Sequence, residues 1–201
     1  MIGAFVALIS AKVCLIMGFA GPAALLLACL LAMFYASAYG FTIEKMAYRP
    51  LRNSSRLAPL ISAIGMSIFL QNFVMLAQSS EFQSFPMLLP ELNLPEPWFY
   101  WLQASSLLII GVTIFALVGL TLMLKYTKMG QAMRAIAQDK TMARLLGVNV
   151  DKTISLTFVI GSFLAALAGV LIANHVGQIN FYIGFLAGIK AFTAAVLGGI
   201  G

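Results

Sequence analysis

The ionisable side chains that could take part in binding or catalysis are concentrated in one stretch of this chain, Lys125 to Lys152. It holds six of the twelve Lys and Arg residues and two of the six Asp and Glu residues, while the sequence on either side is apolar. A cationic segment between two hydrophobic spans is typical of a cytoplasmic loop, because positively charged loops stay on the cytoplasmic side of a membrane. These side chains offer ionic and hydrogen-bonded contacts to another molecule. We therefore expect a docking surface for a separate protein that drives this one.

The residues from Met129 to Leu146 follow a helical period. Apolar residues fall on one side of the predicted helix and polar residues on the other: Met129, Ala132, Met133, Ile136 and Ala143 on the first, and Gln131, Arg134, Gln138 and Thr141 on the second. Asp139 can cap a second turn of helix, and Gly147 can end it in a left-handed conformation. The pattern predicts two helical parts, Met129 to Gln138 and Asp139 to Leu146, lying along the membrane surface.

Such an amphipathic segment either anchors the protein at the membrane or binds a partner. Its small side chains, Ala132, Ala135, Ala137 and Ala143, would let the cleft of another protein close tightly around it, which favours docking. The residues predicted to take part in docking are Gly130, Arg134, Ala135, Asp139, Ala143, Arg144 and Gly147.

No pattern in the sequence indicates catalysis or a cofactor. His175 has no Ser, Cys or acidic partner at a recognisable spacing, so a membrane-embedded transferase is not favoured. Cys14 and Cys29 lie in apolar stretches without the spacing of metal ligands, and we predict no metal site. A phosphate-binding G-x-x-x-x-G-K-[ST] loop is absent. Any ATP that drives this protein would therefore be bound by a partner chain.

Ions or protons that drive transport usually leave an ionisable residue inside the membrane. No Asp or Glu lies within the predicted spans, which argues against an ion- or proton-coupled transporter. Lys190 lies inside the last apolar segment and either faces a water-filled cavity or reaches the outer headgroups. Ser67 and Gln71 share a helical face, with Asn72 beside it, and these residues either line a pathway or bond neighbouring helices. The candidate pathway residues are Ser67, Gln71, Asn72 and Lys190.

The composition requires a membrane to hold these elements. Hydrophobic residues make up 62% of the chain and charged residues 9%, against roughly 45–50% and about 25% in soluble domains. At about 20 apolar residues per helical span, the chain has room for about five or six spans. We predict an all-α, multi-pass helical bundle, with residues 1–201 forming one transmembrane domain and 125–152 its cytoplasmic coupling segment.

The apolar runs and the charges between them define a topology. The expected spans are Met1 to Gly18 (in part), Pro22 to Phe41, Leu57 to Ala77, Trp98 to Leu124, Thr153 to Ala173, and a segment from Phe185. Residues 45–56 and 125–152 carry the cations and are predicted inside, while 79–97 and 174–184 are predicted outside. Both ends stop within apolar sequence, so we expect a fragment of a longer chain.

Small residues recur every four positions in two of the predicted spans. The first set is Gly161, Ala165, Gly169 and Ala173, and the second is Ala187, Ala191, Ala195 and Gly199. Such ridges let helices approach closely, so the first is predicted to be a packing seam.

Several blocks of the sequence resemble one family of transport proteins. These are 38–40 (AYG), 48–52 (YRPLR), 61–72 (ISAIGMSIFLQN), 129–139 (MGQAMRAIAQD), 143–149 (ARLLGVN), 156–161 (LTFVIG) and 190–201 (KAFTAAVLGGIG). They resemble the bacterial ABC-type permeases for branched-chain amino acids, and most closely the H-type permease subunit of leucine, isoleucine and valine uptake systems.

The resemblance implies an all-helical permease subunit in the bacterial inner membrane. Its partners would be a second permease subunit, cytoplasmic ATPase subunits that bind the ATP, and a periplasmic substrate-binding protein, with no nucleic acid involved. Residues 130–147 would form the coupling helix that sits in a cleft of the ATPase. The remaining alternatives are an ion- or proton-coupled secondary transporter and a related permease for urea, amides or sugars.

Overall fold

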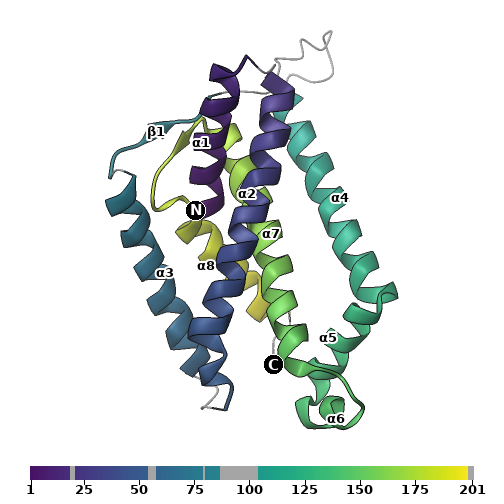
Figure 1. Cartoon of the computed structure of the whole chain (residues 1–201). Coiled ribbons are helices and arrows are strands. Elements are labelled where there is room, and N and C mark those ends of the chain that lie inside the picture. The colour runs from purple at the N-terminus through teal and green to yellow at the C-terminus, as the bar shows by residue number, and fades with distance from the viewer. Residues whose placement is uncertain (19–20, 54–57, 79, 87–103, 199–201) are drawn as a thin grey trace.

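The computed structural model describes the whole chain except residues 19–20, 54–57, 79, 87–103 and 199–201. The described residues are mainly helical, which confirms the all-α prediction (Figure 1). The α-helices are α1 (Ile2–Ile16), α2 (Gly21–Ile43), α3 (Ala58–Ala77), α4 (Ala104–Tyr126), α5 (Lys128–Gln138), α6 (Lys140–Leu145), α7 (Val150–Val176) and α8 (Ile183–Leu197). After α2 come a π-helical turn, η1 (Glu44–Tyr48), and a 3-10 turn, η2 (Pro50–Asn53).

Three of the described helical stretches are long and apolar enough to cross a membrane: Gly21–Tyr48, Ser106–Tyr126 and Val150–Val176. Three shorter apolar helices lie at Ile2–Ile16, Ile61–Ala77 and Ile183–Leu197. All six coincide with predicted spans. The first, α1, has 15 residues and rises roughly 22 Å, which is less than a membrane thickness. The predicted start of the fourth span, with Trp98, lies outside the described residues.

Helices α1, α2 and α7 form the densely packed part of the fold (Figure 1). The side chains at their contacts are small and fully buried: Ala4, Ala7 and Ala11 of α1, Ala24, Ala28 and Ala32 of α2, and Ala173 of α7. A Cβ added at Gly3 would lie 2.8 Å from the Cβ of Ala166, so α1 and α7 nearly touch through their backbones. Lipid is as apolar as these side chains, so the closeness of the packing, more than burial itself, stabilises the contact.

The predicted ridge on α7 is confirmed in its second half and wrong in its first. Ala173 is fully buried, and a Cβ at Gly169 would lie 3.8 Å from the Ala4 amide nitrogen. Gly161 and Ala165 are exposed, and a Cβ at Gly161 would meet open space. The close contacts use the neighbouring register, where Ser162 approaches Gly40 and Ala166 approaches Gly3. Ser162 and Ala166 are small residues four positions apart, as Gly161 and Ala165 are, so spacing alone does not select between the two pairs. The second predicted ridge also lies mainly on the surface of this chain, since α8 has no buried residue.

The described residues of the two segments predicted outside include a pair of short strands. Strands β1 (Gln83–Ser84) and β2 (Gln178–Ile179) pair antiparallel, and the Phe85 amide donates to the Gly177 carbonyl oxygen at 2.9 Å. This pairing agrees with placing both segments on one side of the membrane. The predicted turn at 174–184 is wrong in its bounds, because α7 continues to Val176 and Gly177 ends it at φ 71°.

Candidate functional site

The segment predicted to be cytoplasmic, residues 125–152, contains two short helices, as predicted. α5 begins where the Thr127 hydroxyl accepts from the Gly130 amide at 3.1 Å. Asp139 separates the helices and caps α6, accepting from the amides of Thr141 at 2.7 Å and Met142 at 3.2 Å. Because each cap satisfies amides that lack helical partners, the break is fixed locally by the sequence.

The end of α6 is equally well defined. Gly147 adopts φ 83°, its amide donates to the Arg144 carbonyl, and the Val148 amide donates to the Ala143 carbonyl, both at 3.0 Å. This pair of backbone hydrogen bonds is the Schellman motif, and it requires the left-handed conformation that glycine adopts readily. The Asn149 side chain then caps α7 by accepting from the Lys152 amide at 3.1 Å. Asp139 and Gly147, the two caps predicted from the sequence, are confirmed.

The two faces of the segment also match the prediction. The residues predicted on the apolar side are buried or half-buried, and those on the polar side, Gln131, Arg134, Gln138 and Thr141, are exposed. Ile136 of α5, Ala143 of α6 and Val150 of α7 form a small hydrophobic core of their own. The helix pair is therefore packed directly onto the base of α7.

A tight corner joins the pair to α4. Gly130 is buried, and an added Cβ would lie 2.6 Å from the carbonyl carbon of Leu124. Only a residue without a side chain allows α5 to turn this closely beneath α4. Arg134 reaches back across the corner, with its Nη2 atom 3.5 Å from the Lys125 carbonyl oxygen.

The predicted docking residues thus fall into two groups. Arg134, Asp139, Arg144 and Gly147 are exposed, whereas Gly130 and Ala143 are buried and Ala135 is half-buried. The buried ones hold the helix pair against the spans, and the exposed ones form its accessible surface. Their contact with an ATPase stays a prediction.

A cluster of charged side chains joins the C-terminal end of α2 to the N-terminal end of α7. Arg52 of η2 bridges two carboxylates, donating through Nη2 to Glu44 and through Nη1 to Asp151. The Ser155 hydroxyl donates to the second oxygen of Glu44 at 2.6 Å. Arg49 lies 3.8 Å from Asp151. We call Glu44, Arg52, Asp151 and Ser155 the ionic clamp.

The clamp corrects one sequence prediction. α2 does not end at Phe41 but continues through η1, and this places Glu44 within an apolar helical stretch at only 1% exposure. An acid does therefore lie in a candidate span. A buried carboxylate is tolerated there because Arg52 neutralises it and Ser155 donates to it.

The clamp has no signature in the sequence, because its partners lie far apart along the chain. Arg52 and Asp151 are 99 residues apart, and Glu44 and Ser155 are 111 apart. The one residue that could have indicated the clamp is Glu44, since it is the first acid of the chain and follows a long apolar stretch.

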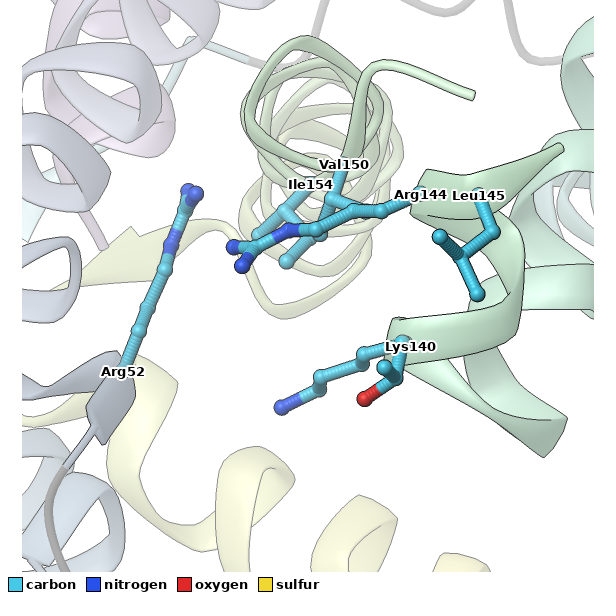
Figure 2. A pocket seen from close by; sticks show the side chains of 7 residues that line it. Arg52, Lys140, Arg144, Leu145, Val150 and Ile154 are labelled. Carbon is cyan, nitrogen blue, oxygen red and sulfur yellow. The ribbon is translucent and has the colours of Figure 1, made fainter. Parts of the chain in front are cut away.

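A cavity opens beside the clamp, between η2, α6 and the base of α7 (Figure 2). Its volume is about 390 Å³, and its lining residues are Arg52, Lys140, Thr141, Arg144, Leu145, Val150 and Ile154. Figure 2 shows Arg52 on one side of this space and Lys140 and Arg144 extending into it from the other. The site combines cations with an aliphatic wall.

The predicted pathway residues do not form one cluster. On α3, Gln71 is buried at 8% exposure and Ser67 is half-buried, so the face they share points inward. Asn72 is exposed and its amide donates to the Ile68 carbonyl of the same helix at 2.9 Å. Lys190 is exposed on α8. A role of these residues in translocation stays a prediction.

The whole chain, residues 1–201, matches the protein family described as branched-chain amino acid transport system / permease component. It is 53% identical, over 173 residues, to the high-affinity branched-chain amino acid transport system permease protein LivH of Escherichia coli (strain K12), which covers 85% of this chain and 56% of that protein. It is 49% identical to the corresponding permease protein BraD of Pseudomonas aeruginosa over 100% of this chain and 67% of that protein.

A weaker similarity reaches another transport system. The autoinducer 2 import system permease protein LsrC of Enterobacter sp. (strain 638) is 39% identical over 77 residues, which cover 38% of this chain and 22% of that protein. No solved structure matches the chain. The chain spans a little over half the length of the LivH relatives, 56% in the Escherichia coli protein.

Proposed function

We propose that this chain forms part of the membrane pathway of an ATP-driven importer, because it belongs to the family of permease components of branched-chain amino acid transport systems. In this proposal it lies in the bacterial inner membrane beside a second permease subunit. Cytoplasmic ATPase subunits bind and hydrolyse the ATP, and a periplasmic binding protein delivers the substrate. The permease itself uses no cofactor.

The observation that carries this proposal is the double attachment of the α5–α6 pair. The outer face of α5 is polar and exposed, while the inner face of the pair is packed onto α7 through Ile136, Ala143 and Val150. The Gly130 corner attaches the same pair to α4. A partner that moves this pair would therefore move the cytoplasmic ends of two apolar helices together, as coupling of ATP hydrolysis to transport requires.

The acids of the candidate spans support an external energy source. Glu44 and Asp151, which lie within two of the three candidate spans, are both engaged by Arg52 in the described structure. Carboxylates held in ion pairs are poorly suited to carrying a proton or an ion through a membrane. This favours an ATP-driven importer over a secondary transporter.

Branched-chain amino acids are the proposed substrate class. The Escherichia coli and Pseudomonas aeruginosa relatives, which are named for the transport of these amino acids, are similar over 85% and 100% of this chain, whereas the autoinducer 2 permease is similar over 38% of it. Within the chain, Ser67 and Gln71 provide the inward polar face that we propose for the pathway, and Asn72 and Lys190 remain secondary candidates.

Charge reversal at Arg134 tests the coupling role. Arg134→Glu in the full-length permease should lower uptake of labelled leucine about tenfold, because a reversed charge at a docking surface costs on the order of 1.4 kcal/mol or more. Membrane insertion should be unchanged, and ATP hydrolysis by the reconstituted complex should no longer follow uptake.

Lys45→Glu provides the matched control, since Lys45 is also an exposed cation on the cytoplasmic side but lies on η1, outside the coupling segment. This variant should transport leucine at the unmodified rate. Normal uptake by Arg134→Glu would refute the coupling assignment.

A further inference from the structure

The cavity beside the ionic clamp has walls from η2, from α6 and from the first turns of α7. It shares one residue, Arg144, with the predicted docking residues, and its other lining residues do not belong to that set. The cavity contains about 390 Å³, enough for a headgroup-sized molecule. Its occupant must suit both cations and aliphatic side chains.

The charge of the cavity is not balanced by the protein. Arg52 is neutralised by Glu44 and Asp151. In contrast, Lys140 and Arg144 have no ion pair and no side-chain hydrogen bond among the described residues. Both side chains extend into the cavity (Figure 2). Two unpaired cations that converge on one space provide a site for an anionic group.

The position of the cavity indicates where its ligand comes from. Val150 and Ile154 belong to the first turns of a helix that is long and apolar enough to cross the membrane, and they form the back of the cavity (Figure 2). On α6, Leu145 is 77% exposed and Leu146 is 80% exposed. Exposed leucines beside cations are typical of a helix at the boundary between headgroups and acyl chains.

We propose that this cavity binds the phosphate headgroup of an anionic phospholipid from the cytoplasmic leaflet. Lys140 and Arg144 donate charge-assisted hydrogen bonds to the phosphate oxygens. Leu145, Val150 and Ile154 contact the adjoining glycerol and the start of the acyl chains. The lipid thereby fills the space between α6 and α7 and holds the coupling helices at a fixed depth.

Lipid binding to the full-length permease tests this site. Phosphatidylglycerol and phosphatidylcholine with the same acyl chains are titrated into the delipidated protein, and bound lipid is measured by native mass spectrometry. The unmodified protein should prefer phosphatidylglycerol. The double variant Lys140→Gln, Arg144→Gln should bind it roughly 25-fold more weakly, at about fivefold for each cation removed.

Lys128→Gln is the matched control, because Lys128 is an exposed cation at the start of α5 and does not line the cavity. It should bind phosphatidylglycerol as the unmodified protein does. Equal binding of both lipids to the unmodified protein would overturn the proposal without depending on any variant's folding. Unchanged lipid binding by the double variant would also overturn it.

Two further measurements test whether the bound anion is something other than a lipid headgroup. Displacement of phosphatidylglycerol by millimolar inorganic phosphate would identify a site for free anions and overturn the lipid assignment. Loss of ATPase association in the double variant, with lipid binding intact, would assign the cavity to a carboxylate of that partner instead.

Discussion

Helices α2 and α7 are held together in two different ways along their length. Within the membrane, the α1–α2–α7 bundle has small residues in near-backbone contact, such as Gly40 against Ser162 and Gly3 against Ala166. One turn beyond Gly40, the two helices are instead joined by the ionic clamp, whose long side chains bridge α2, η2 and α7.

The two contacts depend on different physics. In the packed seam, attraction falls off within a fraction of an ångström, so the contact allows little movement and selects for small residues. In the clamp, charges attract over several ångströms and hydrogen bonds fix direction. The adjustable contact lies at the end of α7 onto which the α5–α6 pair is packed. We infer that movement of the α5–α6 pair is resisted first by the clamp and only then by the seam.

Removing the clamp's cation should have the largest effect. Arg52→Met leaves the buried Glu44 carboxylate without its neutralising partner, and breaking a buried pair in this way costs about 3–5 kcal/mol. Thermal unfolding of the full-length permease in detergent should show this loss. In the double variant Glu44→Gln, Arg52→Met most of the stability should return, because no buried charge is left unpaired.

Arg144→Met is the control for loss of a cytoplasmic cation, since Arg144 is exposed and unpaired among the described residues. Its unfolding temperature should stay close to that of the unmodified protein. An equal loss in Arg52→Met and in the double variant would show that the carboxylate is not stabilised by the arginine.

Adding one methyl group to the seam should have a smaller effect. In Gly3→Ala the new Cβ would lie 2.8 Å from the Ala166 Cβ and 2.9 Å from its Cα, so the backbone must shift. Overpacking of this kind costs about 1–3 kcal/mol. The same substitution at Gly119, where a Cβ meets nothing within 4 Å, should be neutral or slightly stabilising. Equal unfolding temperatures for the two variants would show that the seam is looser than its geometry indicates.

The sequence predicted what is decided locally. The faces of α5 and α6 follow from their helical period, and Asp139, Gly147 and Asn149 act on amides or carbonyls within four residues of themselves. The register of the seam and the partners of Glu44 are decided by how distant helices meet. Neither the register nor these partners can be recognised in a short stretch of sequence. Ser162 and Ala166 are small residues, as Gly161 and Ala165 are, and Glu44 has the position of an ordinary acid at a helix end.

Removing the Asp139 cap between α5 and α6 should have the smallest effect on stability. This variant tests whether the ionic clamp and the α5–α6 pair open separately. Asp139→Ala deprives the Thr141 and Met142 amides of their acceptor, at a cost of about 1 kcal/mol. Hydrogen exchange at those two amides should accelerate about fivefold, while Asp139→Asn keeps an acceptor and should exchange as the unmodified protein does.

Hydrogen exchange in the first turns of α7 provides the decisive comparison for the Asp139→Ala variant. The Ile136, Ala143 and Val150 core, not the Asp139 cap, joins α6 to α7, so amides near Ser155 should keep their exchange rates in Asp139→Ala. Faster exchange there as well would mean that cap, core and clamp open as one cooperative unit. In that case the clamp would not be a separate, adjustable contact but part of the coupling helices themselves.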